Sequence, residues 1–183
     1  MVDTLSSQSI QNLDASPVVA NTSGVGARGE VCEYSDYVTP TAAGIQSTSS
    51  LYKMVRLPLY IKVKELVLTA DAHLDTSSGL SLDVGAYWSD STVDGTPASL
   101  QGTQISANCF AAAIDFHTSF TKVNADTAWT AADRNKPLWQ ALGLSSGATG
   151  APPVGFVDVV IAVHTGATTG VSNPLGISVK TVW

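Results

Sequence analysis

The sequence predicts an all-β protein, an antiparallel β-sandwich that is jelly-roll-like, with one short helix and an extended N-terminal arm. Several stretches alternate apolar and polar residues with a period of two, which is typical of half-buried strands. The segments between them are rich in Gly, Asp, Ser and Pro, the residues of tight turns. Helices do not alternate with these strands, which argues against a parallel α/β sheet.

The first part of the chain, residues 1–49, is expected to form an extended arm and a linker. Residues 1–29 are rich in Ser, Gln, Asn, Thr and Gly, and their apolar residues are too sparse for an amphipathic helix or a regular strand. Such an arm is either mobile or ordered by a partner that accepts isolated apolar side chains. The arm residues expected to contact that partner are Leu5, Ile10, Leu13, Val18 and Val19.

Two further segments lie between the arm and the main domain. Residues 30–38 have a β-rich composition that is compatible with an edge strand. Residues 39–50 carry Pro, Gly and a Ser/Thr cluster, which indicates a linker or a long loop. The sandwich domain is therefore expected over residues 50–183.

Alternation predicts the strands of this domain. Within residues 59–70 the apolar positions shift by one at Glu65, and a slip of one in a period of two indicates a β-bulge or a change of sheet. The cleanest alternation lies at 80–87. Residues 157–163 and 175–181 alternate as well and predict the last two strands.

One helix is expected at residues 135–143. Asn135 can cap its start, Pro137 suits the first turn, and Gly143 suits the end. A helix of about two turns is stable only when it packs against the rest of the protein.

The composition excludes several classes of protein. Only 13% of the residues are charged, the net charge is −6 and the pI is about 4.7, so binding of nucleic acid by a basic patch is not expected. The mean hydropathy is +0.18 and no apolar run is long enough for a membrane span. Ser and Thr together make up about a fifth of the chain, which predicts a surface rich in neutral hydroxyl groups.

The two cysteines, Cys32 and Cys109, do not make a disulfide scaffold. Both lie in apolar surroundings and are expected to be buried free thiols. A single bridge between them stays open, because the sequence does not show whether the fold brings them together.

Two motifs match catalytic or nucleotide-binding patterns in residue type and spacing but lack the secondary structure that these patterns require. Residues 24–29 have the glycine spacing of a dinucleotide site, but no helix follows to bind a pyrophosphate. Residues 143–147 match the nucleophile elbow around Ser145, followed by Asp158 and His164. The strand before the serine and the helix after it are missing, and Asp158 and His164 are too far apart on one strand for a triad.

The acids and histidines do not predict a metal site. Asp115 and His117 would share a strand face, but spacing places no third ligand near them. Asp71, Asp75 and Asp83 lack the glycine and the terminal Glu of a calcium loop. We therefore expect no catalytic residue, no metal and no cofactor.

Two groups of residues leave alternatives open. The tryptophans either line a sugar platform or anchor the core and interfaces. The basic residues around the first strong strand either meet an acidic partner, protect a sheet edge, or lie on a solvated face. The two groups are Trp88, Trp129, Trp139 and Trp183, and Lys53, Arg56, Lys62 and Lys64.

Four segments together resemble a family of small structural proteins of tailed bacteriophages, encoded near the major capsid gene. They are LYKMVRLP at 51–58, LDVGAYW at 82–88, LWQALGL at 138–144, and the closing stretch 157–183. The resemblance covers roughly residues 50–183 and leaves the arm out.

The resemblance implies a non-enzymatic virion protein, a head decoration or cement protein that binds the major capsid protein and stabilises the shell. It also implies assembly in the host cytoplasm, a place in the phage head, and a homo-oligomer, with a trimer favoured by capsid symmetry. The alternative is a phage fibre or receptor-binding module whose sandwich binds a glycan. No nucleic-acid or membrane partner is expected. For the cement role, we expect removal of residues 1–29 to leave the sandwich folded and to abolish capsid association.

Overall fold

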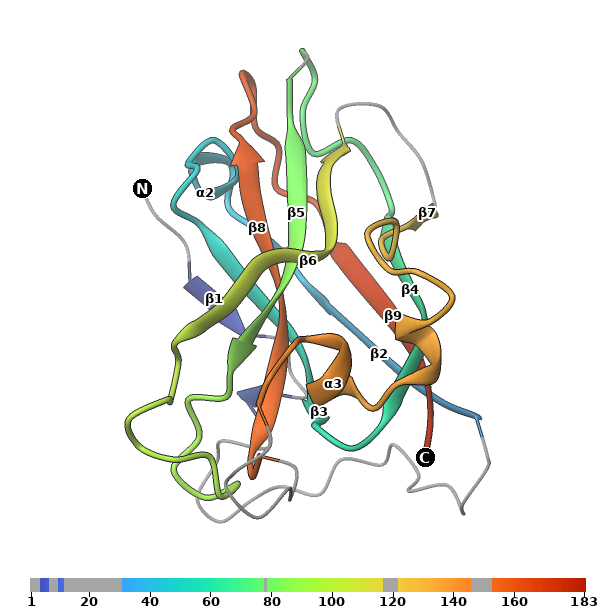
Figure 1. The fold of residues 1–183 in the computed structure, drawn as a ribbon. Coiled ribbons are helices and arrows are strands. Elements are labelled where there is room, and N and C mark those ends of the chain that lie inside the picture. Colours follow the sequence, from blue (N-terminus) through green and yellow to red (C-terminus); the bar gives the residue numbers. More distant parts are fainter. Residues whose placement is uncertain (1–3, 7–9, 12–30, 78, 117–121, 146–152) are drawn as a thin grey trace.

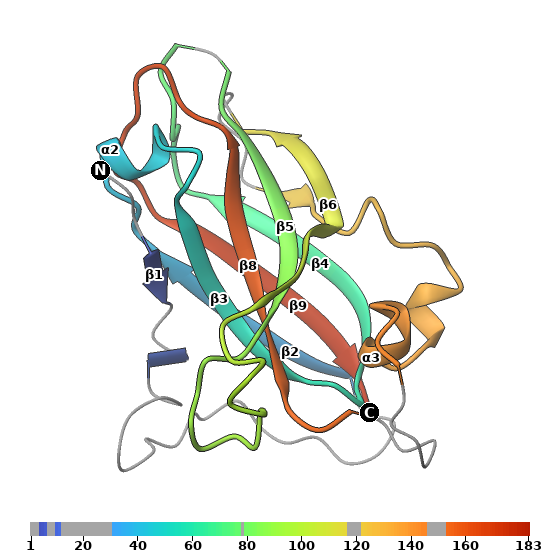
Figure 2. The ribbon, with the colours of Figure 1, turned by 60° about the vertical axis from the view of Figure 1, so that its left-hand side comes forward.

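The computed structural model describes residues 4–6, 10–11, 31–77, 79–116, 122–145 and 153–183. These residues form two packed β-sheets (Figures 1 and 2). The five-stranded sheet has the order β1-β3-β8-β5-β6, and the four-stranded sheet has the order β2-β9-β4-β7. The elements are β1 (Thr4–Ser6), β2 (Val31–Val38), α2 (Ala42–Ile45), β3 (Leu51–Pro58), β4 (Lys62–Ala70), β5 (Ser81–Trp88), β6 (Gln104–Asp115), β7 (Val123–Asn124), η1 (Asp133–Asn135), α3 (Leu138–Ala141), β8 (Phe156–Thr165) and β9 (Leu175–Val182).

The strand order is that of a jelly roll. β2 pairs with β9, β3 with β8, β4 with β7, and β5 with β6, all antiparallel. In the series from β2 to β9, the first strand thus pairs with the last, the second with the last but one, and so on. This is the pairing of one long two-stranded ribbon. Rolling up this ribbon brings β9 beside β4 and β8 beside β5 and closes the two sheets. The prediction of an antiparallel, jelly-roll-like sandwich is confirmed.

The core lies between the sheets, and the period of two explains which side chains enter it. In β9 every second residue is buried, from Leu175 to Thr181. In β4 the ladder to β9 shifts between Val63 and Glu65, so the bulge expected at Glu65 is confirmed. The central strand β5 is buried on both faces, although its sequence alternates.

The helix predicted at 135–143 is confirmed only in part. α3 makes a single turn, because Pro137 stands before it in an extended conformation, with φ −55° and ψ 148°. Asn135 ends η1 instead of capping a helix. Gly143 has φ +69°, which suits the predicted helix end. The turn is held in place by the rest of the protein, since the Leu138 N–H donates to the Ile61 carbonyl at 2.7 Å.

The segment predicted as a linker at 39–50 contains a second short helix, so the prediction of one helix was incomplete. The Thr41 hydroxyl caps α2 by accepting a hydrogen bond from the Gly44 N–H at 2.9 Å. Ile45 is fully buried and anchors α2 to the core. α2 thereby leads the chain from the four-stranded sheet at β2 to the five-stranded sheet at β3.

The predicted edge strand at 30–38 is present as β2, and it lies at the edge of the four-stranded sheet. It pairs with β9 over its whole length, from Val31 to Val38. The division of the chain into an arm and linker at 1–49 and a sandwich at 50–183 stays a prediction.

Candidate functional site

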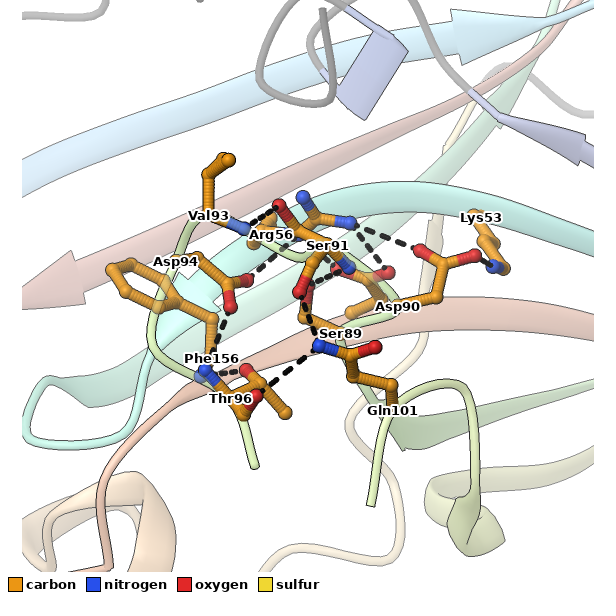
Figure 3. Close-up of polar contacts among 11 residues, drawn as sticks. Lys53, Arg56, Ser89, Asp90, Ser91, Val93, Asp94, Thr96, Gln101 and Phe156 are labelled. Atoms are coloured by element: carbon orange, nitrogen blue, oxygen red, sulfur yellow. Dashed lines mark hydrogen bonds and ion pairs between the residues drawn. The ribbon is translucent and has the colours of Figure 1, made fainter. Parts of the chain in front are cut away.

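A cluster of buried charges connects the five-stranded sheet to a long loop (Figure 3). Arg56 of β3 is only 5% exposed and Asp158 of β8 is fully buried. The two residues are cross-strand partners. The Arg56 Nε donates to Asp158 Oδ1 at 2.7 Å and the Nη2 donates to Oδ2 at 3.1 Å. Burial raises the pKa of Asp158, and the two-pronged contact with the guanidinium acts in the opposite direction.

Two aspartates of the loop between β5 and β6 join this pair. The Arg56 Nη2 donates to Asp90 Oδ1 at 3.3 Å, and the Arg56 Nε lies 3.8 Å from Asp94 Oδ2. Lys53 pairs with the other oxygen of Asp90. Burial raises the pKa of Asp90, but the hydrogen bond and charge of Lys53, a backbone hydrogen bond and the charge of Arg56 together outweigh this effect, so the pKa is lowered. β3 thus holds the loop to the sheet by ionic contacts.

Side-chain hydrogen bonds stiffen the same loop, which runs from residue 89 to 103. The Thr96 N–H donates to Asp94 Oδ1 at 2.9 Å, and the Thr96 hydroxyl accepts from the Phe156 N–H at 3.2 Å. The Gln101 amide donates to the carbonyls of Ser91 and Thr96 at 2.9 and 3.2 Å. A loop whose own polar groups are satisfied in this way is preorganised and loses little entropy on binding.

The end of this loop presents apolar side chains to solvent. Val93 is 62% exposed and Val154, just before β8, is 70% exposed. The two segments lie side by side, because a Cβ on Gly95 would be 3.8 Å from Val154 Cγ1. We name Val93, Gly95 and Val154 the loop tip. A rigid loop with exposed apolar residues is a candidate contact surface for another protein.

The sequence does not single out the loop at 89–103, although Lys53, Arg56 and Asp158 are named above for other roles. Arg56 was left between an acidic partner, edge protection and a solvated face, and the structure shows acidic partners inside the same chain. Lys53 shares them, whereas Lys64 of β4 donates to the Arg134 carbonyl at 2.6 Å. The available signal was the pair of basic residues Lys53 and Arg56 in β3 and the single acidic residue Asp158 in β8.

The arm residues fall into three groups. Leu5 lies in β1, which pairs in parallel with the first residues of β3. Ile10 is fully buried within the chain itself. Leu13, Val18 and Val19 lie outside the described residues. That these five residues contact a partner stays a prediction, and two of them already take part in the fold.

The elements of a catalytic triad are not brought together. Asp158 is bound to Arg56, and His164 Nδ1 lies 3.0 Å from Asp83 Oδ2. Ser145 is exposed and follows α3. Asp83 has a structural task as well: it accepts the N–H of Ala113, which has a positive φ of 48°. The glycines at 24–29 lie outside the described residues.

The aspartates that the sequence groups together do not form a metal site in the described part of the chain. Asp75 is buried and accepts backbone N–H groups from Ser77 and Thr169 at 3.0 and 3.1 Å. Burial alone raises the pKa of Asp75, but these hydrogen bonds outweigh it and the pKa is lowered. His117 lies outside the described residues, and those described include no group of three or more metal-ligating side chains.

The tryptophans are mostly core residues. Trp88 and Trp129 are buried, and the ring of Trp129 stacks on Phe110 with centroids 4.8 Å apart. Trp183 packs against Tyr60 with centroids 4.9 Å apart. Trp88 and Trp129 therefore present no open ring face to a sugar.

The two cysteines are free thiols, so no bridge joins them. Cys32 is buried, as expected, whereas Cys109 is only partly buried. Burial raises the pKa of Cys109 to about 12, which keeps its thiol protonated and unreactive at neutral pH. Among the described residues, no helix has the length and apolar character that a membrane span requires.

Comparison with solved structures finds similar chains in phage capsids. A chain from the capsid of Ralstonia phage GP4 matches with a TM-score of 0.66 and 17% identity, over 98% of this chain and 97% of that chain. A chain of the cyanophage Pam1 capsid asymmetric unit matches with a TM-score of 0.45 and 17% identity, over 92% and 95%. A chain of the acidic stable capsid structure of Helicobacter pylori bacteriophage KHP30 has a TM-score of 0.36 and 13% identity, over 82% and 87%.

No protein-family model matches the sequence, and no curated protein matches it either. At 17% identity the likeness to the chain from phage GP4 shows a shared fold, over nearly the full length of both chains.

Proposed function

We propose that this chain is a structural protein of a phage head, a decoration or cement protein that binds the major capsid shell and stabilises it. The observation that carries the proposal is the fold shared with a chain of the phage GP4 capsid over 98% of this chain. The segment resemblance to small phage head proteins points to the same role. We propose no catalytic role, because Asp158 and His164 are bound to Arg56 and Asp83 respectively.

We propose that the loop tip and the arm make the contact with the shell. Val93 supplies exposed apolar area on a loop that is already held by hydrogen bonds, which lowers the entropic cost of binding, and Val154 adds exposed apolar area beside it. The arm adds contact points through Leu13, Val18 and Val19, and several linked contacts raise the overall affinity. A trimer is proposed for the oligomer, since three copies match the local symmetry of a shell.

Co-sedimentation with empty shells tests the proposal. Shells assembled from the major capsid protein of the phage that encodes this chain are mixed with the full-length protein and pelleted. We expect saturation at a fixed ratio of copies to shell subunits, and a native mass of three chains for the free protein. Absence of binding at saturating protein, with a folded chain, would overturn the proposal.

A pair of matched variants tests the loop tip. Replacing both Val93 and Val154 by Asp places charges in the contact, and we expect the affinity for shells to fall by about tenfold or more. Val31→Asp is the control, because Val31 of β2 is 65% exposed but belongs to the four-stranded sheet. Equal loss with both variants would show that the loop tip is not the contact.

A fibre or receptor-binding module remains the second candidate. Two of the four tryptophans that could line a sugar platform, Trp88 and Trp129, are buried, so they give this role no support.

A further inference from the structure

The outer face of the four-stranded sheet is hollowed at one end, where β2 and β4 end and β9 begins. Tyr37 of β2 pairs with Gly176 of β9, and Gly176 pairs with Thr69 of β4, so the three residues form one row across the sheet. Together with Asp71 and Pro174 they line a cavity of about 340 Å³. This size falls in the range of small-ligand sites.

Gly176 creates the hollow, because it leaves the middle of the row without a side chain. A Cβ at this position would lie 2.6 Å from the Thr69 Oγ1, closer than real Cβ contacts. The Thr69 hydroxyl therefore lies close over Gly176 and forms part of the floor. Tyr37 stands at one side of this floor with 63% of its surface exposed, so its ring is open to a ligand.

Three polar groups around the hollow have no partner among the described residues. The Asp71 carboxylate, the Thr69 hydroxyl and the Tyr37 hydroxyl make no hydrogen bond or ion pair there, while the Tyr37 backbone N–H donates to Asp36. This differs from nearby Asp75, whose oxygens accept several backbone N–H groups. The hollow thus offers one acceptor-only group and two groups that both donate and accept.

We propose that this hollow is a carbohydrate-binding subsite. The C–H face of a pyranose ring complements the electron-rich face of the Tyr37 ring. The Asp71 carboxylate accepts hydrogen bonds from sugar hydroxyls, and the Thr69 hydroxyl both donates and accepts with them. A lysine or arginine head group could pair with the Asp71 carboxylate and stack on the Tyr37 ring. It has no acceptor, however, for a hydrogen bond donated by the Thr69 or Tyr37 hydroxyl. A polyhydroxylated ring uses all of these groups.

Saturation-transfer NMR with a panel of neutral methyl pyranosides and disaccharides tests the proposal on the full-length protein. We expect at least one sugar of the panel to bind with a Kd of about 10 mM or tighter, the affinity of a small exposed site. Tyr37→Ala is expected to weaken that binding by about tenfold or more, and Asp71→Ala by a similar factor.

Tyr60→Ala is the matched control, because Tyr60 is also an exposed tyrosine, at 53%, and its ring packs on Trp183 away from the hollow. We expect its sugar binding to equal that of the unchanged chain. Lack of any bound sugar, or equal loss in the Tyr37 and Tyr60 variants, overturns the proposal. Displacement of the sugar by arginine methyl ester at equal concentration also overturns it in favour of a cation site.

The carbohydrate proposal does not rest on the proposed capsid role, and an experiment can disprove either one while the other holds. The hollow lies near the end of β2, and the loop from 89 to 103 lies at the opposite end of the sandwich (Figures 1 and 2). Tyr37→Ala is therefore expected to co-sediment with shells like the unchanged chain. If Tyr37→Ala loses shell binding and no sugar binds, the hollow contacts the shell and the carbohydrate proposal is wrong.

Discussion

Arg56 and Asp158 show how one residue pair organises the five-stranded sheet. Both side chains are buried, and their contact has the parallel two-bond geometry that suits a guanidinium and a carboxylate. Such a pair is costly to desolvate, so it adds little net stability compared with apolar residues. Removing only one partner is much worse, because the other charge stays buried and unpaired.

Replacing Arg56 by Met is therefore expected to lower the free energy of unfolding by about 3–5 kcal/mol. Asp158 loses both of its Arg56 hydrogen bonds, and Asp90 loses one. Urea denaturation followed by tryptophan fluorescence measures the effect. Lys136→Ala serves as the control, since its pair with Asp133 is exposed to solvent and contributes little to stability. A loss for Arg56→Met no larger than for Lys136→Ala would contradict the expectation.

Asp75 makes the stability of the folded protein depend on pH in the acid range. Its pKa is lowered in the folded state, because backbone N–H donors outweigh the effect of burial. The folded state therefore binds this proton more weakly than the unfolded chain does. The resulting stabilisation is present above the unfolded pKa and is lost as the pH falls through the folded pKa.

We expect Asp75→Asn to flatten the pH dependence of stability in acid, from the ordinary pKa of an aspartate, about 3.9, downwards. At neutral pH the variant is expected to lose about 1–3 kcal/mol, because the amide keeps only one acceptor oxygen and its NH2 group cannot accept from the N–H groups of Ser77, Thr168 and Thr169. Urea midpoints measured at several pH values check both effects. An unchanged slope in acid would show that other carboxylates control it.

At the scale of single elements, the close packing of β5 against β6 requires a glycine at position 85. A Cβ on Gly85 would lie 2.3 Å from the carbonyl oxygens of Ser106 and Ala107. Both obstacles are backbone atoms of β6, so no side-chain rotation relieves the clash. The close approach goes with an irregular ladder between β5 and β6, whose register shifts several times.

Gly85→Ala is accordingly expected to cost about 3 kcal/mol or more. Gly143→Ala is the control, because a Cβ there meets nothing within 4 Å and only the positive φ of 69° is strained. Its cost is expected to be about 1–2 kcal/mol. Thermal unfolding of both variants measures the two losses of stability. Equal losses would mean that β6 shifts away from the new Cβ without cost.

The start of the chain also contributes to stability. β1 covers part of the edge of β3, and Ile10 fills space in the interior. We expect Ile10→Ala to cost about 2–5 kcal/mol in unfolding free energy. Removal of residues 1–29 is expected to leave a folded sandwich of lower stability, because the β2–β9 series stays complete. Circular dichroism melting curves of both variants measure this, and unaltered curves would contradict it.

The sequence predicts some elements better than others, for physical reasons. β9 and the bulge at Glu65 follow directly from alternation, because one face of the strand meets the core. β6 is missed, since its ladder is irregular and Ala113 has a positive φ, which interrupts the pattern. α2 is missed because a single turn depends on the burial of Ile45, which is a tertiary contact.

The candidate surfaces are harder to predict than the strands. Val93 lies in a segment of turn residues, and nothing local shows that Arg56 and Asp158 hold this segment rigid. The row of Tyr37, Gly176 and Thr69 joins three strands that are distant in the chain. Only the pairing of the strands brings such residues together, and composition does not specify the pairing.

On the scale of the whole molecule, the low charge governs how the protein binds. With 13% charged residues and many hydroxyls, its contacts depend on shape, apolar area and neutral hydrogen bonds. Several of its described charges are paired within the chain, such as Lys180 with Glu65. Long-range electrostatic attraction to a partner is therefore a minor contribution.

We accordingly expect the affinity for shells to change by less than about threefold between about 0.05 and 0.5 M NaCl. Sedimentation across a salt series measures it. The lysine variant Lys180→Glu, which reverses one charge on the four-stranded sheet, is expected to leave this behaviour unchanged. A steep fall of affinity with salt would mean that ion pairs dominate the contact.

The rolled-up ribbon has a consequence for how the chain is made. β9 is synthesised after the other described strands, yet it is an inner strand that pairs with both β2 and β4. Until this segment has left the ribosome, the four-stranded sheet lacks the strand that joins β2 to β4, and Val31 has no cross-strand partner because it pairs with Val182. Pairings so distant in the chain make folding slow and leave apolar strands exposed in the meantime. The sandwich therefore folds only after β9 has left the ribosome, and until then the chain is exposed to aggregation and to binding by chaperones.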